Sequence, residues 1–175
     1  VEMNGPENGP PVVLVHGFSS PMFMWDRQVA ALAGAGFRVL RYDLYGRGYS
    51  DRPHATYNED LFDRQLLELL DSQGLRAPVN LIGLSMGGAI ALHFTDRHPD
   101  RVHRLGLIAP AGMMALPAAS RLLVAPGLGW WILRVFGDRI ITERMPRGLA
   151  SDNDLQRFVA EYAGQLRFRG YKRAL

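Results

Sequence analysis

Cysteine is absent from the 175-residue sequence, which excludes disulfide bonds, a thiolate nucleophile and cysteine-ligated metal. Long hydrophobic runs are absent too. The most apolar stretch, residues 122–136, is interrupted by Pro126, two glycines and Arg134, and it is shorter than the roughly 20 residues that a membrane helix needs. The opening VEMNGPENGPP lacks the basic start and apolar core of a secretory signal. We therefore predict no integral membrane segment and a cytoplasmic location.

Motifs for metals, nucleotides and nucleic acids are also missing. No histidine pair or carboxylate–histidine cluster has the spacing of metal ligands. GLSMGG, residues 83–88, fits neither G-x-G-x-x-G nor the Lys-Ser/Thr end of a phosphate-binding loop, which argues against a nucleotide-binding α/β protein. The net charge of +3 comes from a basic excess after residue 120, but no nucleic-acid-binding module accompanies it. We expect no metal, no cofactor and no nucleic-acid partner, and we interpret the basic segment as a solvated or contact surface.

Hydrophobic patterning predicts an α/β protein. Hydrophobic residues make up 47% of the chain and charged residues 21%, as is usual for a globular domain. Short apolar runs alternate with amphipathic stretches of helical period. The runs predict strands at residues 12–15, 37–42, 79–82 and 105–108, and the amphipathic stretches predict helices near residues 25–32, 58–73 and 86–97. This alternation is typical of a parallel sheet with helices on both faces, and the strand signal stops after about residue 117.

One short motif carries the chemistry. GLSMG, residues 83–87, fits G-x-S-x-G and stands between the third predicted strand and the third predicted helix. In that context the serine adopts a strained backbone conformation that lifts its hydroxyl clear of the sheet edge. Gly83 and Gly87 have no side chain to clash in such a bend. The alternative is an ordinary strand-to-helix turn in which Ser85 caps the helix. We predict that Ser85 is a nucleophile.

A second segment supplies a partner for this serine. His16-Gly17-Phe18 follows the first predicted strand. A tetrahedral oxyanion needs two N–H groups that already point at it, and the amides of Phe18 and Met86 are the candidates. We expect His16 to orient its loop through hydrogen bonds and not to act as the general base.

A polar, glycine-rich turn follows the second predicted strand. It reads DLYGRGYS and covers residues 43–50. Asp and Gly are typical of turns, where the carboxylate accepts hydrogen bonds from nearby backbone N–H groups. We therefore predict a structural, backbone-capping role for Asp43.

Four segments resemble, in order, core segments of the α/β-hydrolase superfamily: VVLVHGFSS, RYDLYGRGYSDRP, LIGLSMGGAIALHF and HPDRVHRLGLIAPAG. They are most similar to those of bacterial carboxylesterases and monoacylglycerol-lipase-like enzymes. The resemblance covers about residues 8–115. It implies a partial α/β-hydrolase core over residues 1–116, followed by the start of a helical cap over residues 117–175. It also implies that the sequence is truncated at both ends, since only the tail of the family's leading β-hairpin precedes the first strand.

The same resemblance implies Ser85 as the nucleophile, with Phe18 and Met86 as the oxyanion donors. In this superfamily the acid and the histidine come later in the chain, in the order Ser…Asp/Glu…His. The sequence stops at Leu175, in a segment that resembles the end of the cap. We therefore expect both groups to be missing from this chain.

No local residue replaces them convincingly. After the fourth predicted strand, where some relatives keep the acid, this sequence has Ala109-Pro110-Ala111. His93 lies about 12 Å from Ser85 along one predicted helix, at about 1.5 Å per residue. His103 precedes the fourth strand at the opposite end of the sheet, and His54 is in a loop that would have to swing in. The missing strands would leave a sheet edge unpaired, so we expect a homo-oligomer or a second chain that covers it and supplies Asp and His.

The sequence thus predicts a serine hydrolase acting on small carboxylic esters, in which Ser85 forms an acyl-enzyme that water clears. Two alternatives stay open. One is a catalytically inactive fragment or binding protein that lacks a base, and the other is a cofactor-free perhydrolase or C–C hydrolase that uses the same serine. Dehalogenase and epoxide-hydrolase chemistry is disfavoured, because those relatives carry aspartate where Ser85 stands. The apolar stretch at 122–136 either lines an acyl pocket or packs over the core.

Overall fold

The computed structural model describes residues 1–112, 152–165, 168 and 171 of the chain. The chain divides into two compact units, Val1–Met113 and Met114–Leu175. Within the second unit the structure describes helix α6 (Asp152–Gln165). The apolar stretch at 122–136 and most of the predicted cap lie outside the described residues.

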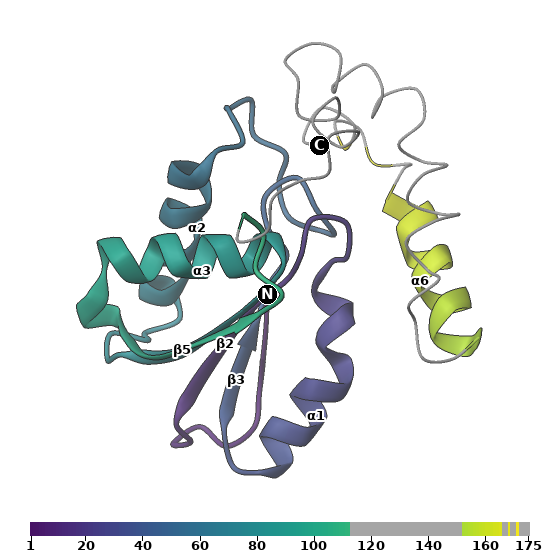
Figure 1. The fold of residues 1–175 in the computed structure, drawn as a ribbon. Helices are drawn as coiled ribbons and strands as arrows, with labels where there is room; N and C mark the ends of the chain where they lie inside the picture. The colour runs from purple at the N-terminus through teal and green to yellow at the C-terminus, as the bar shows by residue number, and fades with distance from the viewer. Residues whose placement is uncertain (113–151, 166–167, 169–170, 172–175) are drawn as a thin grey trace. The chain divides into compact units, whose positions relative to one another are not determined.

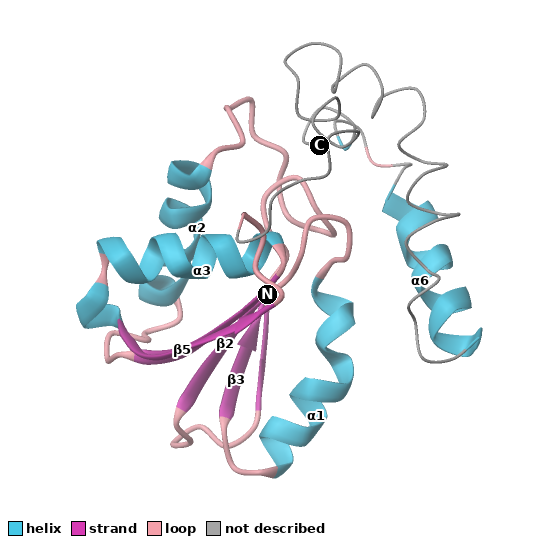
Figure 2. Cartoon of the chain, viewed as in Figure 1, coloured by secondary structure: helices cyan, strands magenta, loops and turns pink. Residues whose placement is uncertain are grey.

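A five-stranded sheet forms the first unit, in the order β1-β3-β2-β4-β5 (Figures 1 and 2). Strands β2 to β5 pair in parallel, as predicted. Strand β1 pairs antiparallel with β3, so the sheet is mixed and not purely parallel. The strands are β1 (Glu2–Asn4), β2 (Pro11–Val15), β3 (Arg38–Arg41), β4 (Val79–Leu84) and β5 (Val102–Ile108).

Helices cover both faces of this sheet. Helix α1 (Asp26–Gly34) lies on one face, and α2 (Glu59–Ser72) and α3 (Met86–Arg97) lie on the other (Figure 1). Two short 3-10 helices, η1 (Met22–Trp25) and η2 (Pro99–Arg101), precede α1 and β5. The predicted layer arrangement is confirmed.

Strand β2 shows how the two layers share the sheet. Successive side chains of a strand point to opposite faces. Val13 and Val15 pack in the apolar core that α2 and α3 complete, whereas Val12 and Leu14 pack in the core that contains Trp25. All four valine and leucine side chains of β2 are buried. A run that is apolar at every position is therefore what a strand covered on both sides requires.

Helix α2 begins and ends where its sequence predicts. The Asn58 side chain accepts a hydrogen bond from the Leu61 N–H at 3.1 Å, which caps the helix. Glu59 and Asp60 occupy the first turn, where negative charge favours the helix dipole. After the helix, Gly74 has φ = +69°, a conformation that glycine adopts without strain.

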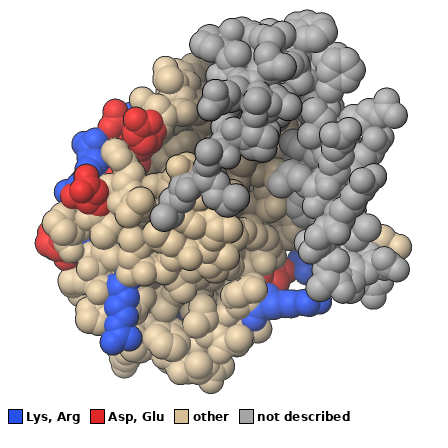
Figure 3. Space-filling view, viewed as in Figure 1, with Lys and Arg blue, Asp and Glu red and all other residues tan. Residues whose placement is uncertain are grey.

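Charged side chains of both signs gather along the left rim of the face in Figure 3, beside α2. Among the ion pairs, Arg97 of α3 contacts Asp60 of α2 at 2.7 Å, and Arg101 contacts Asp71 at 2.8 Å. Such exposed pairs contribute at most about 1 kcal/mol each. Within the described ranges, no helix is long and apolar enough to cross a membrane, and no group of His, Asp and Glu has the arrangement of a metal site.

Candidate active site

The bend between β4 and α3 is centred on Ser85. Its backbone has φ = 52° and ψ = −117°, a positive φ that a non-glycine residue rarely adopts. Such strain costs about 1–3 kcal/mol and persists only where the surroundings enforce it. The Ser85 hydroxyl makes no capping hydrogen bond to α3. The predicted strained bend is confirmed. The alternative, in which Ser85 caps the helix through its side chain, is wrong.

Main-chain hydrogen bonds hold this bend from three sides. The Ser85 N–H donates to the carbonyl oxygen of Ile108, at the end of β5, at 2.9 Å. The Ser85 carbonyl oxygen accepts from the N–H of Gly88, within α3, at 3.0 Å and from the N–H of Ala111 at 2.9 Å. Because β5 and the segment after it both bond to Ser85, the strained residue cannot relax without breaking the neighbouring pairing.

Two glycines let α3 approach the sheet. A Cβ atom at Gly87 would lie 2.3 Å from the carbonyl oxygen of Val15 and 2.4 Å from that of His16. A Cβ atom at Gly83 would lie 2.2 Å from the carbonyl oxygen of Gly87. All of these neighbours are backbone atoms, so the packing has no side chain that could move aside. The G-x-S-x-G pattern is therefore a packing requirement of this bend.

The loop after β2 meets the serine. A Cβ atom at Gly17 would lie 3.5 Å from the Cβ of Ser85, so the backbone of residue 17 borders the Ser85 side chain. Phe18 follows directly and is half-buried. Met86 is the first residue of α3, where backbone N–H groups have no partner within the helix. The structure thus brings both predicted oxyanion donors to the same bend, and their role stays a prediction.

His16 is a buried, neutral residue that orients its own loop. The Leu44 N–H donates to Nε2 of His16 at 2.9 Å, which leaves the ring proton on Nδ1. That Nδ1–H donates to the carbonyl oxygen of Gly17 at 2.7 Å. Burial lowers the pKa of His16 from 6.5 to about 4, although the hydrogen bond to Gly17 and the charge of Asp43 act to raise it. With both nitrogens engaged, His16 has the predicted structural role.

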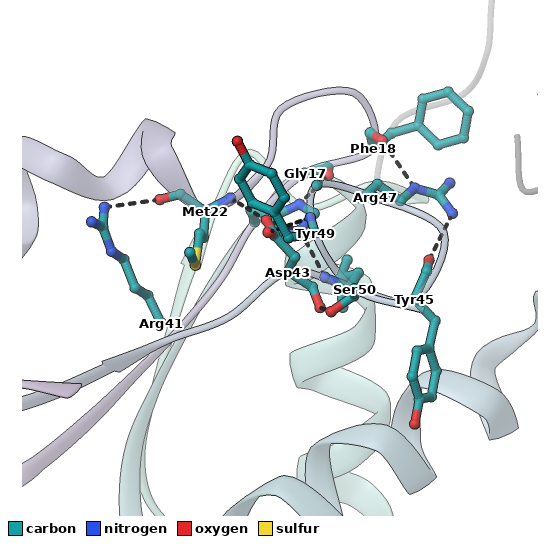
Figure 4. A network of polar contacts seen from close by, with 12 residues as sticks. Gly17, Phe18, Met22, Arg41, Asp43, Tyr45, Arg47, Tyr49 and Ser50 are labelled. Carbon is teal, nitrogen blue, oxygen red and sulfur yellow. Dashed lines mark hydrogen bonds and ion pairs between the residues drawn. The ribbon is translucent and has the colours of Figure 1, made fainter. Parts of the chain in front are cut away.

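Asp43 joins two loops at the end of β3 (Figure 4). Its Oδ1 accepts a hydrogen bond from the Met22 N–H at 2.8 Å, and its Oδ2 accepts from the Tyr49 N–H at 3.0 Å. The carboxylate is buried. Gly48 has φ = +50°, and a Cβ atom there would lie 2.1 Å from Asp43 Cγ. The predicted backbone-capping role of Asp43 is confirmed.

Sequence reasoning missed Arg47. Its side chain is only 2% exposed, and Nε donates to the carbonyl oxygen of Phe18 at 3.2 Å. Its Nη1 donates to the carbonyl oxygen of Tyr45, also at 3.2 Å (Figure 4). An arginine between two glycines of a polar turn is typical of an exposed loop, so the pattern holds no signal of this burial.

The other histidines are the remaining candidate partners for Ser85, and the structure gives three of them different surroundings. Nε2 of His98, just after α3, lies 3.1 Å from Oδ2 of Asp63. His103 lies inside β5 and is exposed, which corrects the prediction that it precedes this strand, because β5 starts earlier than its apolar part. His54 is also exposed. We therefore assign none of these histidines as the general base for Ser85.

Sequence comparison finds relatives of this chain among known proteins. A family model described as alpha/beta hydrolase fold matches residues 10–143. A putative non-heme chloroperoxidase from Synechocystis sp. is 38% identical over 103 residues, covering 58% of this chain and 37% of the relative. A 2-hydroxymuconate semialdehyde hydrolase from Pseudomonas sp. is 37% identical over 108 residues, covering 60% of this chain and 38% of the relative. The chain thus spans less than two fifths of the length of either relative.

Structural comparison agrees with this result. The crystal structure of an enol-lactonase from Burkholderia xenovorans superimposes with a TM-score of 0.79 at 27% sequence identity, covering 99% of this chain and 66% of the enol-lactonase chain. Because the family model matches more than half of the sequence, the chain belongs to the α/β-hydrolase fold family.

Proposed function

We propose that this chain carries the nucleophile of a serine hydrolase that acts on carboxylic esters. One observation supports this most directly: Ser85 is held at φ = 52° with a hydroxyl that caps no helix. Such strain costs free energy and clusters at functional sites, and a nucleophile elbow depends on it.

The proposed reaction begins when Oγ of Ser85 attacks the ester carbonyl carbon. The carbonyl oxygen becomes an oxyanion that accepts hydrogen bonds from the N–H groups of Phe18 and Met86. The Oγ proton passes to a general base and then to the departing alkoxide, which leaves as the alcohol. Water then attacks the acyl-enzyme, releases the carboxylic acid and restores the serine.

The general base and its acid partner are proposed to come from outside the described residues. A second chain that pairs with β5 is proposed to supply the histidine and the aspartate, and a homo-oligomer is the other proposed way to cover this edge of the sheet. Strand β5 is the last strand of the described sheet, and Ile108 at its end is 45% exposed. A cytoplasmic location is proposed as well.

Labelling with a fluorophosphonate tests the proposal. The protein should react at one serine, and Ser85→Ala should abolish that labelling. Hydrolysis of p-nitrophenyl acetate should fall by at least about 1,000-fold in the same variant, because loss of the nucleophile removes most triad catalysis. Ser50→Ala is the matched control, since the Ser50 hydroxyl donates to the Asp43 carbonyl oxygen and has no proposed chemical role.

The relatives favour a second candidate. A 2-hydroxymuconate semialdehyde hydrolase and a putative non-heme chloroperoxidase are both similar to this chain, so cleavage of a C–C bond or perhydrolysis through Ser85 is the alternative chemistry. A substrate panel separates the candidates by which turnover Ser85→Ala abolishes. An unlabelled protein, alone and with any co-purifying chain, would instead support a catalytically inactive binding protein.

A further inference from the structure

We propose that Arg47 is a positioning residue that holds the Gly17–Phe18 segment so that the Phe18 N–H points at the reacting oxygen. This inference rests on the proposed hydrolase function. Arg47 lies in the loop between β3 and α2, far in sequence from Phe18. Its side chain nevertheless crosses to the loop after β2 (Figure 4) and donates from Nε to the Phe18 carbonyl oxygen at 3.2 Å.

The backbone of Arg47 is itself fixed. Its N–H donates to the Leu44 carbonyl oxygen at 2.9 Å, and its carbonyl oxygen accepts from the Ser50 N–H at 3.1 Å. These bonds belong to the turn that the buried Asp43 carboxylate organises. The guanidinium therefore extends from a rigid base.

Aromatic rings surround the guanidinium. Its central carbon lies 5.0 Å from the centroid of the Phe18 ring, and 5.9 Å from those of Tyr57 and Phe62. Burying a cation is costly unless its donors and its charge find partners, and cation–π contact supplies part of that compensation. Arg47 thus contacts Phe18 twice, at the carbonyl oxygen through Nε and at the ring through the guanidinium group.

Holding Phe18 on both sides of its N–Cα bond fixes the direction of its N–H. The ring and the carbonyl both branch from the Phe18 Cα, so Arg47 restrains the Cα side of this bond. On the other side, the Nδ1–H of His16 donates to the Gly17 carbonyl oxygen at 2.7 Å. That oxygen and the Phe18 N–H belong to one planar trans peptide and point in opposite directions. His16 and Arg47 therefore hold this peptide from its two ends.

The alternative is that Arg47 only stabilises the fold. A purely structural role predicts a lower melting temperature with an unchanged kcat in whatever fraction stays folded. A positioning role predicts a fall in kcat with little change in KM, because a misplaced oxyanion donor weakens binding of the transition state and not of the substrate.

Three variants separate these roles in the complete protein. Arg47→Met removes the donors but keeps the length, and Arg47→Lys keeps the charge and one donor. Arg52→Met is the matched control, because Arg52 donates within its own loop, to the carbonyl oxygens of Ser50 at 2.9 Å and Gly48 at 2.8 Å. Each variant is compared with the parent protein for kcat and KM on p-nitrophenyl acetate and for the rate of fluorophosphonate labelling.

Arg47→Met should lower kcat and the labelling rate by about 10–100-fold, less than the roughly 100–1,000-fold loss when an oxyanion donor is removed outright. Arg47→Lys should recover part of this loss, and Arg52→Met should stay within about twofold of the parent protein. A folded Arg47→Met protein with the parental kcat and labelling rate would overturn the inference. If Arg47→Met does not fold, Arg47→Lys decides, with a lowered kcat at unchanged KM as the supporting result.

A second measurement does not depend on activity. Selective ¹⁵N labelling of phenylalanine gives eight amide signals, and the signal of Phe18 is the one that Phe18→Leu removes. The Phe18 signal should move in Arg47→Lys and not in Arg52→Met. If the parent protein neither hydrolyses esters nor reacts with the probe, the proposed function fails while this signal still decides the positioning. If the parent protein is active and the signal stays in place, the positioning inference alone fails.

Discussion

Two turns at the same edge of the sheet are held in opposite ways. The bend between β4 and α3, residues 83–88, is fixed by close contact between backbone atoms at Gly83 and Gly87. The loop after β3, residues 43–50, is fixed instead by the buried side chains of Asp43 and Arg47. The position of Ser85 therefore depends on the absence of side chains, whereas the loop beside it depends on two charged side chains.

This difference predicts how each turn responds to changes in pH and charge. Contact between uncharged backbone atoms involves no titrating group, so we expect the position of Ser85 to change little with pH. Buried charges respond to protonation and to the charge of their neighbours. The loops that carry Phe18 and Asp43 are therefore the parts whose stability we expect to depend on pH and on neighbouring charges.

The largest effect is expected where the contact is between backbone atoms. Gly87→Ala places a methyl group 2.3 Å from the Val15 carbonyl oxygen, and we expect a loss of about 3 kcal/mol in the free energy of unfolding. Gly34→Ala is the control, because a Cβ at Gly34 of α1 meets nothing within 4 Å, and there we expect a gain of about 0.5–1 kcal/mol. Urea unfolding measures both changes. Equal stability of the two variants would contradict the claim that close contact at Gly87 fixes the bend.

A smaller loss is expected in the loop. Asp43→Asn keeps the shape but turns one acceptor oxygen into an NH₂ group, which then faces the Met22 or the Tyr49 N–H. An unsatisfied buried donor costs about 1–3 kcal/mol, so we expect a loss near 2 kcal/mol. The control is Asp71→Asn, whose exposed pair with Arg101 contributes at most about 1 kcal/mol. Chemical denaturation of both proteins checks this, and an equal loss in both would contradict the importance of burial.

At neutral pH the smallest effect is expected at His16, because its contribution appears only as a slope when the solution is acidified. His16 has a pKa of about 4 when folded against 6.5 unfolded. Between these values the unfolded chain binds a proton that the folded one does not, so stability falls by up to about 1.4 kcal/mol per pH unit as the solution is acidified. His16→Gln keeps an acceptor for the Leu44 N–H but cannot titrate. The difference in slope between the two proteins, measured by urea unfolding at pH 7 to 4, isolates His16, and parallel slopes would disprove its neutrality.

The sequence predicted the parts of the site that rest on backbone geometry. The spacing of Gly83, Ser85 and Gly87 predicts the strained bend, because only glycine tolerates contact at those two positions. The carboxylate of Asp43 in a glycine-rich turn likewise predicts capping, and both expectations are confirmed. These features are local, so a few adjacent letters suffice to define them.

Features that depend on distant partners could not be predicted in this way. Arg47 is buried because Phe18, Tyr57 and Phe62 converge on it in three dimensions. Strand β1 escaped prediction because three residues with one apolar side chain have too little pattern. Its pairing with β3 appears only in the structure, where Glu2 lies opposite Arg41 and the Arg41 Nε donates to the Glu2 carboxylate at 2.9 Å.

The hydrogen bonds that hold the Ser85 backbone limit how its side chain can move. With the N–H and the carbonyl oxygen both bonded, the position of Oγ can change only by rotation about Cα–Cβ, while the hydroxyl proton still rotates about Cβ–Oγ. Choosing one of its three staggered wells costs no more than about 0.7 kcal/mol of entropy. A serine on an unanchored loop would also have to immobilise its main chain, at about 1–2 kcal/mol for that residue alone. Placing the hydroxyl oxygen therefore requires only the choice of a rotamer, because the folded structure already holds the main chain in place.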